Sequence, residues 1–311
     1  MNKKEISFSV LISSYNYQNC VVDAVSSAIN QSHAPLEVIV VDDGSTDDSV
    51  TLLKQVFGND SRVKIISQSN GGQMSAWAKG LSLAEGEVIA LLDSDDLWKS
   101  EYLATVAEIY LQNPTLDYVY CNMEKFGTEV GLMLKKRRHQ KSRDLGLSVL
   151  MGACIQRWQG VASSGNTIKR ELFQKILSLP ADQIKEWKTR PDDCLFYGSD
   201  ILGGHKYYLA NALVMHREHS RNALQEFTNS PIKTAKYAIR LEKMLDYYRG
   251  MVGFSPTWLK LAKSEFRTKP RPHFSELWIY CFLALQAPTR LASRISQVGA
   301  IIAHYVNSKS H

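Results

Sequence analysis

Short apolar runs alternate with amphipathic segments along the N-terminal half of the chain. The runs are rich in valine, isoleucine and leucine, which is typical of strands buried on both faces of a sheet. The segments between them place apolar residues at helical spacing. Strands separated by helices of about 10–15 residues predict right-handed crossovers and an α/β fold with a mostly parallel sheet. The predicted strands are residues 7–13, 36–41, 62–67, 87–92 and 117–121, and the predicted helices are residues 18–31, 47–57, 73–84 and 100–112.

Polar clusters follow three of these strands, at residues 13–16, 42–46 and 93–96. Ligands of open parallel sheets bind outside the carboxyl ends of the strands. We therefore expect one crevice to receive all three clusters. No G-x-G-x-x-G follows the first strand, and no G-x-x-x-x-G-K-[ST] occurs in the sequence. A dinucleotide-dependent dehydrogenase and a P-loop NTPase are both disfavoured on this ground.

Asp93, Ser94 and Asp95 come directly after a predicted buried strand. Carboxylates at such a position are costly unless they are paired, hydrated or bound to a cation. The D-x-D spacing lets neighbouring side chains address one divalent ion, which prefers oxygen ligands. The alternative is turn and capping chemistry, in which Asp96 caps a helix that begins near Trp98.

A second acidic pair, Asp42 and Asp43, follows another predicted strand. Gly44 can supply a turn, and Ser45 or Asp47 can cap the next helix. The functional alternative is hydrogen bonding to a nucleobase or a ribose. Taken alone, the pair favours the turn.

Four motifs occur in the order SVLISSYN, VIVVDDGSTDDS, NGGQMSAWAKG and VIALLDSDDLW. Their order and spacing closely resemble the family 2 glycosyltransferases, which have the GT-A fold. The resemblance is strong over residues 7–103 and looser up to about residue 222. It implies a Rossmann-like, mostly parallel sheet flanked by helices, a nucleotide-sugar donor that is most often UDP-linked, and Mg or Mn as the cofactor.

The resemblance also implies roles for residues at the first two strand ends. Ser13 and Tyr15 would line the nucleobase pocket, and Asp43, together with Asp42, would contact the base or the ribose. One position departs from the family, because Trp77 stands where many members have the arginine of an Ala-Arg-Asn triplet. A core position and a pocket position for Trp77 both stay open.

Asp93 and Asp95 are similar to the family's D-x-D pair. The resemblance implies that Asp95 is the direct metal ligand and that Asp93 contacts the ribose or the sugar, with Ser94 among the donor-binding residues.

Asp192 and Asp193 precede an apolar helical stretch. By position alone they are acids favoured in the first turn of a helix. They also resemble the family's Glu-Asp pair, whose second acid is the catalytic base. This implies that Asp193 is the base, while Asp192 replaces the more usual glutamate.

Residues 216–222 resemble the family's Y-R-x-H-x-x-N signature, with His216 in place of the tyrosine. The matching histidine is His219, which in several members joins the metal site or contacts the diphosphate. Imidazole suits Mn better than Mg. Arg217 or Arg221 would balance the charge of the diphosphate.

The implied reaction is an inverting glycosyl transfer to an acceptor hydroxyl, in the synthesis of a polysaccharide, lipopolysaccharide or other glycoconjugate. The acceptor would be a saccharide or a lipid-linked sugar. The alternative is a non-catalytic protein, a nucleotide-sugar-binding or membrane-recruited scaffold that keeps the fold. A nucleotidyltransferase is disfavoured, because the first strand is not followed by a glycine-rich loop with lysine or arginine.

Charge divides the chain into two predicted domains. Residues 1–225 hold 24 lysines and arginines against 26 acids, whereas residues 226–311 hold 13 against 5. We predict a catalytic domain over residues 1–225 and a basic, mainly helical C-terminal extension over residues 226–311. The extension either packs on the catalytic domain or docks on an anionic membrane. A basic run at residues 135–141 is either a solvated loop or a site for an anionic acceptor or lipid phosphate.

The remaining features of the sequence bear on the location of the protein, its cysteines and its partners. No apolar run reaches about 18 residues, and the N-terminus has no apolar signal core, which predicts a cytoplasmic protein, with a peripheral position on the membrane face as the alternative. The 5 cysteines are scattered without a C-x-x-C pair, which indicates reduced thiols rather than disulfides or a zinc site. The basic excess comes with no nucleic-acid-binding motif, so we expect no nucleic-acid partner.

Overall fold

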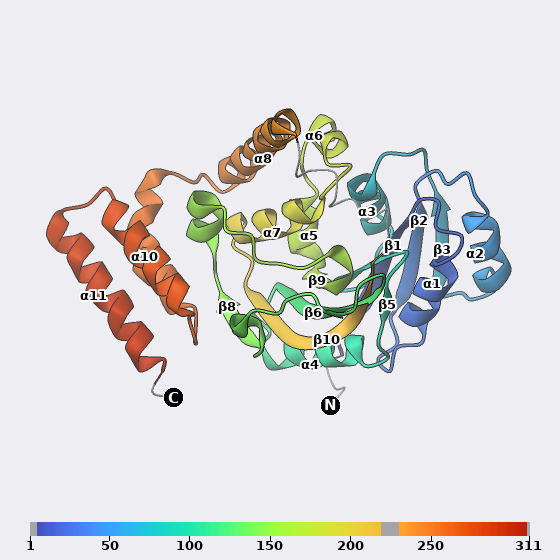
Figure 1. The fold of residues 1–311 in the computed structure, drawn as a ribbon, viewed down its shortest axis with the longest axis horizontal. Helices are drawn as coiled ribbons and strands as arrows, with labels where there is room; N and C mark the ends of the chain where they lie inside the picture. The colour runs from blue at the N-terminus through green and yellow to red at the C-terminus, as the bar shows by residue number, and fades with distance from the viewer. Residues whose placement is uncertain (1–4, 219–229, 310–311) are drawn as a thin grey trace.

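A mixed sheet of ten strands forms the centre of the computed structural model, which describes residues 5–218 and 230–309 (Figure 1). Eight strands follow one another in the order β3-β2-β1-β4-β9-β6-β10-β5, while β7 pairs with β6 and β8 with β10. The strands are β1 (Phe8–Ser14), β2 (Glu37–Asp42), β3 (Val63–Ser67), β4 (Val88–Asp93), β5 (Leu97–Trp98), β6 (Tyr118–Gly127), β7 (Gly131–Leu132), β8 (Arg143–Gly146), β9 (Asn166–Lys169) and β10 (Lys206–Glu218).

Six of the eight strands in this order run in the same direction, so the predicted mostly parallel sheet is confirmed. β3, β2, β1 and β4 are parallel neighbours, and β6 pairs in parallel with β10. β9 and β5 run the opposite way. β9 is inserted between β4 and β6, so the fourth and fifth predicted strands are not neighbours. Every residue of β2 is buried, whereas the edge strand β3 is only partly so.

Helices cover both faces of the sheet. In Figure 1, α3, α5 and α7 lie on one side, while α1 and α4 lie on the other. The bounds of the predicted helices agree with the structure to within a few residues. The helices up to the sheet's last strand are α1 (Val21–Ile29), α2 (Ser49–Phe57), α3 (Gln73–Leu81), α4 (Tyr102–Gln112), α5 (Arg170–Ile176), α6 (Ala181–Glu186) and α7 (Asp192–Ile201).

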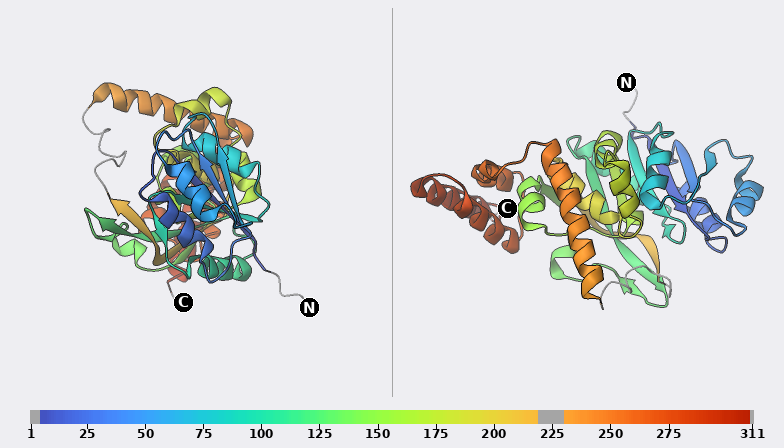
Figure 2. Two further views of the ribbon diagram at one scale, coloured as in Figure 1. Left: turned by 90° about the vertical axis from the view of Figure 1, so that its right-hand side faces the viewer. Right: turned by 90° about the horizontal axis from the view of Figure 1, so that it is seen from above.

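The basic C-terminal region is helical, as predicted, and it packs in two different ways. α8 (Pro231–Met251) lies against α7, and its Met244, Leu245 and Tyr248 belong to the core of the sheet domain. α9 (Ala262–Arg267), α10 (Phe274–Gln286) and α11 (Leu291–Asn307) build a second, smaller core and stand apart at one end of the molecule (Figure 2). None of the described helices has both the length and the apolar character needed to cross a membrane.

Buried polar contacts fasten this second core to the sheet domain. The Glu265 carboxylate accepts hydrogen bonds from the Leu150 backbone N–H and from the Tyr280 hydroxyl. The Lys269 ammonium, which is fully buried, donates to the carbonyls of Leu145 and Leu147. These groups would be costly to bury without partners, so the contacts fix where the helices attach. The division into domains at residue 225 stays a prediction.

Candidate functional site

The carboxyl ends of β1, β2 and β4 lie side by side. The register places Ser13 beside Asp93 and Ser14 beside Asp42. The three polar clusters that follow these strands therefore meet at one edge of the sheet, as the alternation of strands and helices predicted.

Asp43 holds the loop that precedes α3. Its buried carboxylate accepts three hydrogen bonds, from the Gln68 side-chain amide at 2.7 Å and from the backbone N–H groups of Gly71 at 2.9 Å and Gly72 at 2.8 Å. Gly72 has a φ of 86°, a left-handed conformation that favours glycine. The acidic residue thus links two of the motifs in the sequence, and its contact with a nucleobase stays a prediction.

The neighbouring residues combine a turn with polar groups that have no partner. One oxygen of Asp42 accepts from the Ser45 backbone N–H at 3.2 Å, which is the predicted turn chemistry. The other oxygen, Oδ1, and the Ser14 hydroxyl are buried and have no hydrogen-bond partner among the residues described. The Tyr15 side chain is 47% exposed. Tyr15 is therefore open to a ligand, whereas the two oxygens are buried in this structure, and the nucleobase pocket stays a prediction.

Asp93 is at the centre of a network that the sequence did not reveal. The Gln73 amide donates to Asp93 Oδ1 at 2.5 Å and also to the Ser13 hydroxyl at 3.2 Å. The Ser163 hydroxyl donates to Asp93 Oδ2 at 2.6 Å. Gln73 and Ser163 are therefore additional candidates for the site. The only signal for Gln73 in the sequence was the NGGQ motif, and Ser163 lay outside the motifs.

Asp96 forms hydrogen bonds within the protein, and the alternative that it caps a helix beginning near Trp98 is wrong. β5 follows it, and α4 begins only at Tyr102. The fully buried carboxylate accepts from the Ser164 hydroxyl at 2.6 Å, the His216 ring at 3.1 Å and the Arg217 backbone N–H at 2.8 Å. These bonds attach the acidic loop to β10.

The other two residues of the D-x-D motif differ in exposure. Ser94 is buried, whereas Asp95 is partly exposed. The Tyr17 hydroxyl forms a hydrogen bond with the Asp95 side chain, and the Arg217 guanidinium donates to the Asp95 carbonyl at 2.9 Å. Burial and the charges of Asp95 and Asp93 raise the pKa of Tyr17, so this hydroxyl stays a donor at neutral pH.

Negative charge accumulates at this edge of the sheet. Burial, with the charges of Asp96 and Asp95, raises the pKa of Asp93 to about 7. Burial, with the charges of Asp93 and Asp193, raises the pKa of Asp192 well above its usual value, and its buried Oδ1 has no described hydrogen-bond partner. A divalent cation would relieve this repulsion.

The residues present fit such a cation in part. The described residues contain no group of three or more histidines, cysteines and acids placed to hold a metal by themselves. Mg²⁺ is, however, commonly bound by one or two carboxylates together with substrate phosphates. Asp95 and Asp93 can supply those carboxylates. The other predicted ligand, His219, lies outside the described residues, as does Arg221.

The two acids at the start of α7 have different surroundings. Asp193 is 1% exposed, and its two carboxylate oxygens accept hydrogen bonds from Arg190 Nε at 3.0 Å and Arg190 Nη2 at 3.2 Å. The Tyr237 hydroxyl of α8 donates to it at 2.8 Å. Asp192 instead lies close enough to Ser163 for a hydrogen bond and interacts with the charge of Asp93. The structure thus brings Asp192 to the acidic cluster and holds Asp193 beside it.

Trp77 occupies a core position. Its side chain is 1% exposed, and its ring packs 6.2 Å from that of Phe173. It therefore does not supply the pocket with a group equivalent to the family's arginine.

The chain is similar to known glycosyltransferases in sequence and to a solved crystal structure in fold. A family model described as glycosyl transferase family 2 matches residues 9–177. The chain is 32% identical over 216 residues to an uncharacterized glycosyltransferase of Nostoc sp., an alignment that covers 69% of this chain and 65% of the relative. It is 38% identical over 112 residues to the chondroitin synthase of Pasteurella multocida, covering 36% of this chain and 12% of that protein. The chain thus spans less than two thirds of the length of either relative.

The fold is similar to the crystal structure of S. aureus TarS residues 1–349 in complex with UDP-GlcNAc. The TM-score is 0.56 over 97% of this chain and 73% of that chain. The sequences are 17% identical, so this similarity shows the fold alone. The predicted GT-A fold, with its helical C-terminal extension, is confirmed.

The His216–Asp96 pair should make stability depend on pH. Burial alone would lower the pKa of His216, but the hydrogen bond and charge of Asp96 raise it to about 9. Because the pKa is higher in the folded state than in the unfolded state, the contribution is complete below pH ~6.5 and is lost as the pH rises through about 9. We expect His216→Gln to lower the free energy of unfolding by roughly 3 kcal/mol at pH 6, at ~1.4 kcal/mol per pKa unit.

The measurement is urea unfolding of both proteins in metal-free buffer between pH 6 and 10. The difference between them should shrink at the alkaline end. A difference that stays constant over this range would contradict the charged pair.

Proposed function

Because the chain belongs to glycosyl transferase family 2, we propose that it is an inverting glycosyltransferase that moves a sugar from a nucleoside-diphosphate donor to an acceptor hydroxyl. The observation that carries the proposal is the convergence of the three polar strand ends around Asp93. UDP is the first candidate for the nucleotide, since the structurally similar TarS was crystallised with UDP-GlcNAc. The name of the chondroitin synthase supports an acceptor in polysaccharide or other glycoconjugate synthesis.

The donor would lie across the carboxyl ends of β1, β2 and β4. The exposed Tyr15 ring and the unpartnered Ser14 and Asp42 oxygens would face the nucleoside. Gln73 and Ser163 hold the Asp93 carboxylate in one orientation, ready for the ribose or the sugar. The proposed donor-binding residues are Ser13, Tyr15, Asp42, Asp43, Asp93 and Ser94.

Asp193 is the proposed general base. A base must come within hydrogen-bond reach of the hydroxyl whose proton it removes. Arg190 and Tyr237 fix the carboxylate in a buried position beside Asp192. The acceptor hydroxyl would lose its proton to Asp193 and attack the anomeric carbon on the face opposite the leaving nucleoside diphosphate. No covalent intermediate with the enzyme is needed.

Asp95 and Asp93, with His219 as a further candidate, would hold the Mg or Mn ion. When bound, the ion would neutralise the charge that develops on the leaving diphosphate. The acidic cluster supports such an ion, because a cation would relieve the repulsion between the donor phosphates and the ionised carboxylates of Asp93 and Asp192.

Nucleotide binding should depend on the metal. We expect UDP with Mn or Mg to raise the melting temperature of the full chain by several degrees, and UDP alone to raise it much less. Asp95→Asn should remove the metal-dependent part of the rise. Glu108→Gln, an exposed acid on α4, is the matched control and should leave it unchanged. The readout is a thermal-shift series with UDP, GDP and TDP and their sugars. Folded protein that shows no shift with any of these at millimolar ligand would favour the non-catalytic scaffold.

Removing the proposed base should separate binding from chemistry. We expect Asp193→Asn to lower kcat by at least about 10²-fold, because general-base catalysis contributes roughly that much. The affinity for UDP, measured by calorimetry, should change less than twofold. Asp192→Asn, at the preceding position, is the matched variant. If Asp192→Asn abolishes transfer while Asp193→Asn does not, the base is Asp192 and the assignment made here is wrong.

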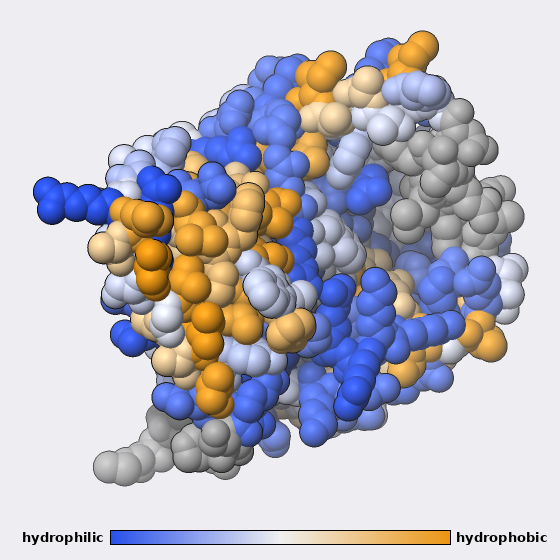
Figure 3. All heavy atoms as spheres, turned by 60° about the vertical axis from the view of Figure 1, so that its left-hand side comes forward, coloured by the Kyte–Doolittle hydropathy of each residue, from blue (hydrophilic) through white to orange (hydrophobic). Residues whose placement is uncertain are grey.

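The C-terminal helices present a surface that favours a peripheral membrane contact. Eight large apolar side chains on α10 and α11 are at least 44% exposed. Figure 3 shows hydrophobic residues gathered on the end of the molecule that carries these helices. Residues 254–311 hold eight lysines and arginines against two acids; both acids and one of the cations, Lys269, are buried, which leaves seven cations. The exposed apolar residues are Phe274, Trp278, Phe282, Leu285, Leu291, Ile295, Ile302 and Val306.

We propose that this face, here named the α10–α11 face, docks on an anionic membrane. Apolar side chains flanked by positive charge are the combination that binds anionic lipid surfaces. Such docking would keep the enzyme beside lipid-linked acceptors.

Vesicle binding tests the α10–α11 face. The full chain should co-sediment with phosphatidylglycerol-containing vesicles and much less with phosphatidylcholine vesicles. Trp278→Glu combined with Ile295→Glu should reduce the bound fraction at least tenfold. Ile232→Glu, on the exposed side of α8, is the control and should have little effect. Loss of a dimer in the double variant, with no vesicle binding by the unmodified chain, would show that a second copy covers the face instead.

A further inference from the structure

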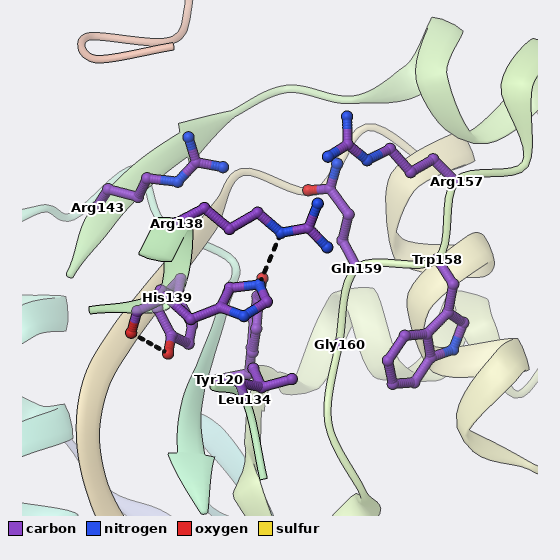
Figure 4. A pocket seen from close by; sticks show the side chains of 10 residues that line it. Tyr120, Leu134, Arg138, His139, Arg143, Arg157, Trp158, Gln159 and Gly160 are labelled. Atoms are coloured by element: carbon purple, nitrogen blue, oxygen red, sulfur yellow. Dashed lines mark hydrogen bonds between the residues drawn. The ribbon is translucent and has the colours of Figure 1, made fainter. Parts of the chain in front are cut away.

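Three arginines line a pocket formed by residues of β6, β8, β10 and two connecting segments (Figure 4). Its cavity volume is about 50 Å³, well below the roughly 300–1,000 Å³ of pockets that enclose a whole ligand, so it suits one small group of a ligand. Arg138 and Arg157 extend toward each other from opposite walls, and Arg143 approaches from a third position. We name it the arginine pocket. Its lining also includes Tyr120, His139, Trp158, Gln159, Gly160 and Tyr208.

Two of the three guanidinium groups have no counterion among the residues that the structure describes. Arg143 pairs with the buried Glu276 of α10, at 3.0 Å. Arg138 donates to the His139 ring at 3.0 Å and forms no ion pair with a described residue. Arg157 has neither an ion pair nor a hydrogen bond within the described ranges, although it is only partly exposed. Uncompensated charge in a confined space is costly, which is typical of a site that awaits an anion.

His139 adds a neutral N–H hydrogen-bond donor to the arginine pocket. Burial and the charges of Arg138 and Arg143 lower the pKa of His139 to about 4, so the ring is neutral at pH 7. Its Nε2 accepts from Arg138, which places the proton on Nδ1. Nδ1 is buried and has no described hydrogen-bond partner. The Tyr208 hydroxyl donates to the His139 carbonyl at 2.9 Å and fixes this segment to β10.

The pocket is connected to the proposed catalytic residues. Gly160 and Ser163 are three residues apart, so their Cα atoms are at most about 11 Å from each other. The Ser163 hydroxyl holds Asp93. The Trp158 ring packs 5.0 Å from the ring of Phe196, which lies one turn beyond the two acids that begin α7. These contacts place the pocket close to Ser163 and to the start of α7.

We infer that the arginine pocket binds an anionic group of the acceptor, a phosphate or a carboxylate, and so selects acidic acceptors. Planar guanidinium forks match the oxygens of both groups, and two unpaired forks facing each other can hold one anion between them. The Trp158 ring, which is 38% exposed, offers apolar surface to the attached sugar. This inference rests on the proposed function, because it assigns the acceptor side of the same site.

The test compares three small probes with the full chain: glucose 6-phosphate, glucuronate and glucose. Calorimetric titrations should show binding of at least one charged probe at least tenfold tighter than binding of glucose, and weaker binding at high salt. Binding of glucose 6-phosphate alone assigns a phosphate-bearing acceptor, and binding of glucuronate assigns a carboxylate-bearing one. Saturating UDP with Mn should leave this binding in place. Competition by UDP would locate the probes in the donor site and overturn the inference.

Arg138→Gln combined with Arg157→Gln should weaken binding of the charged probe at least tenfold. The control is Arg137→Gln combined with Lys141→Gln, which removes the same charge from exposed positions of the same basic run. This control should change the affinity for the charged probe less than twofold. The pocket variant should melt at the same or a higher temperature than the unmodified chain, because it relieves repulsion. UDP binding by the pocket variant should stay normal, which separates this inference from the proposed function. Equal affinities in the two double variants would overturn it.

Discussion

The pairing of β1 with both β2 and β4 is the constraint on which the site depends. Parallel strands end at the same edge, so this pairing brings residues 13–16, 42–46 and 93–96 together. A shift of one residue between β1 and β4 would turn the Asp93 side chain to the other face of the sheet. It would then lose both Gln73 and Ser163. The apolar register of the strands therefore fixes the position of the polar groups.

Acids concentrated at one edge of the sheet repel one another and are costly to bury, and only some of them have partners that compensate for this cost. Asp96 is fully compensated by Ser164, His216 and a backbone N–H group. Asp193 is balanced by Arg190. Asp93 and Asp192 are not balanced in this way, and their pKa values are raised. The uncompensated charge therefore lies on the side where a cation and the donor phosphates are proposed to bind.

The arginine pocket instead has positive charge without counterions among the described residues. Residues 157–165 run from this pocket to the acidic cluster, so a single segment of chain contributes Arg157 to one and Ser163 to the other. The C-terminal extension takes part as well, since Glu276 of α10 holds Arg143 and Tyr237 of α8 holds Asp193. A change in how these helices pack would thus reach both sides of the proposed site.

Local patterns determined much of this protein. The alternation of apolar runs and helical segments gave the strands, the helices and the mostly parallel sheet, because burial on both faces imposes that pattern within a few residues. The same reasoning placed the polar clusters at one edge, and the motif resemblance named the family. These properties depend on neighbours in the sequence or on rules of connection that hold for the whole class of fold.

Only the tertiary structure decided which side chains contact one another in the site. The insertion of β9 between β4 and β6 brought Ser163 and Ser164 to the acidic loop, across about 70 residues of sequence. The same long-range packing made Asp96 an acceptor of hydrogen bonds from β10 rather than the helix cap of the alternative interpretation, and it put Trp77 into the core. It also joined Arg138 and Arg157 in one pocket. No sequence spacing encodes such contacts, because they arise only when separate elements pack against each other and their buried polar groups must find partners.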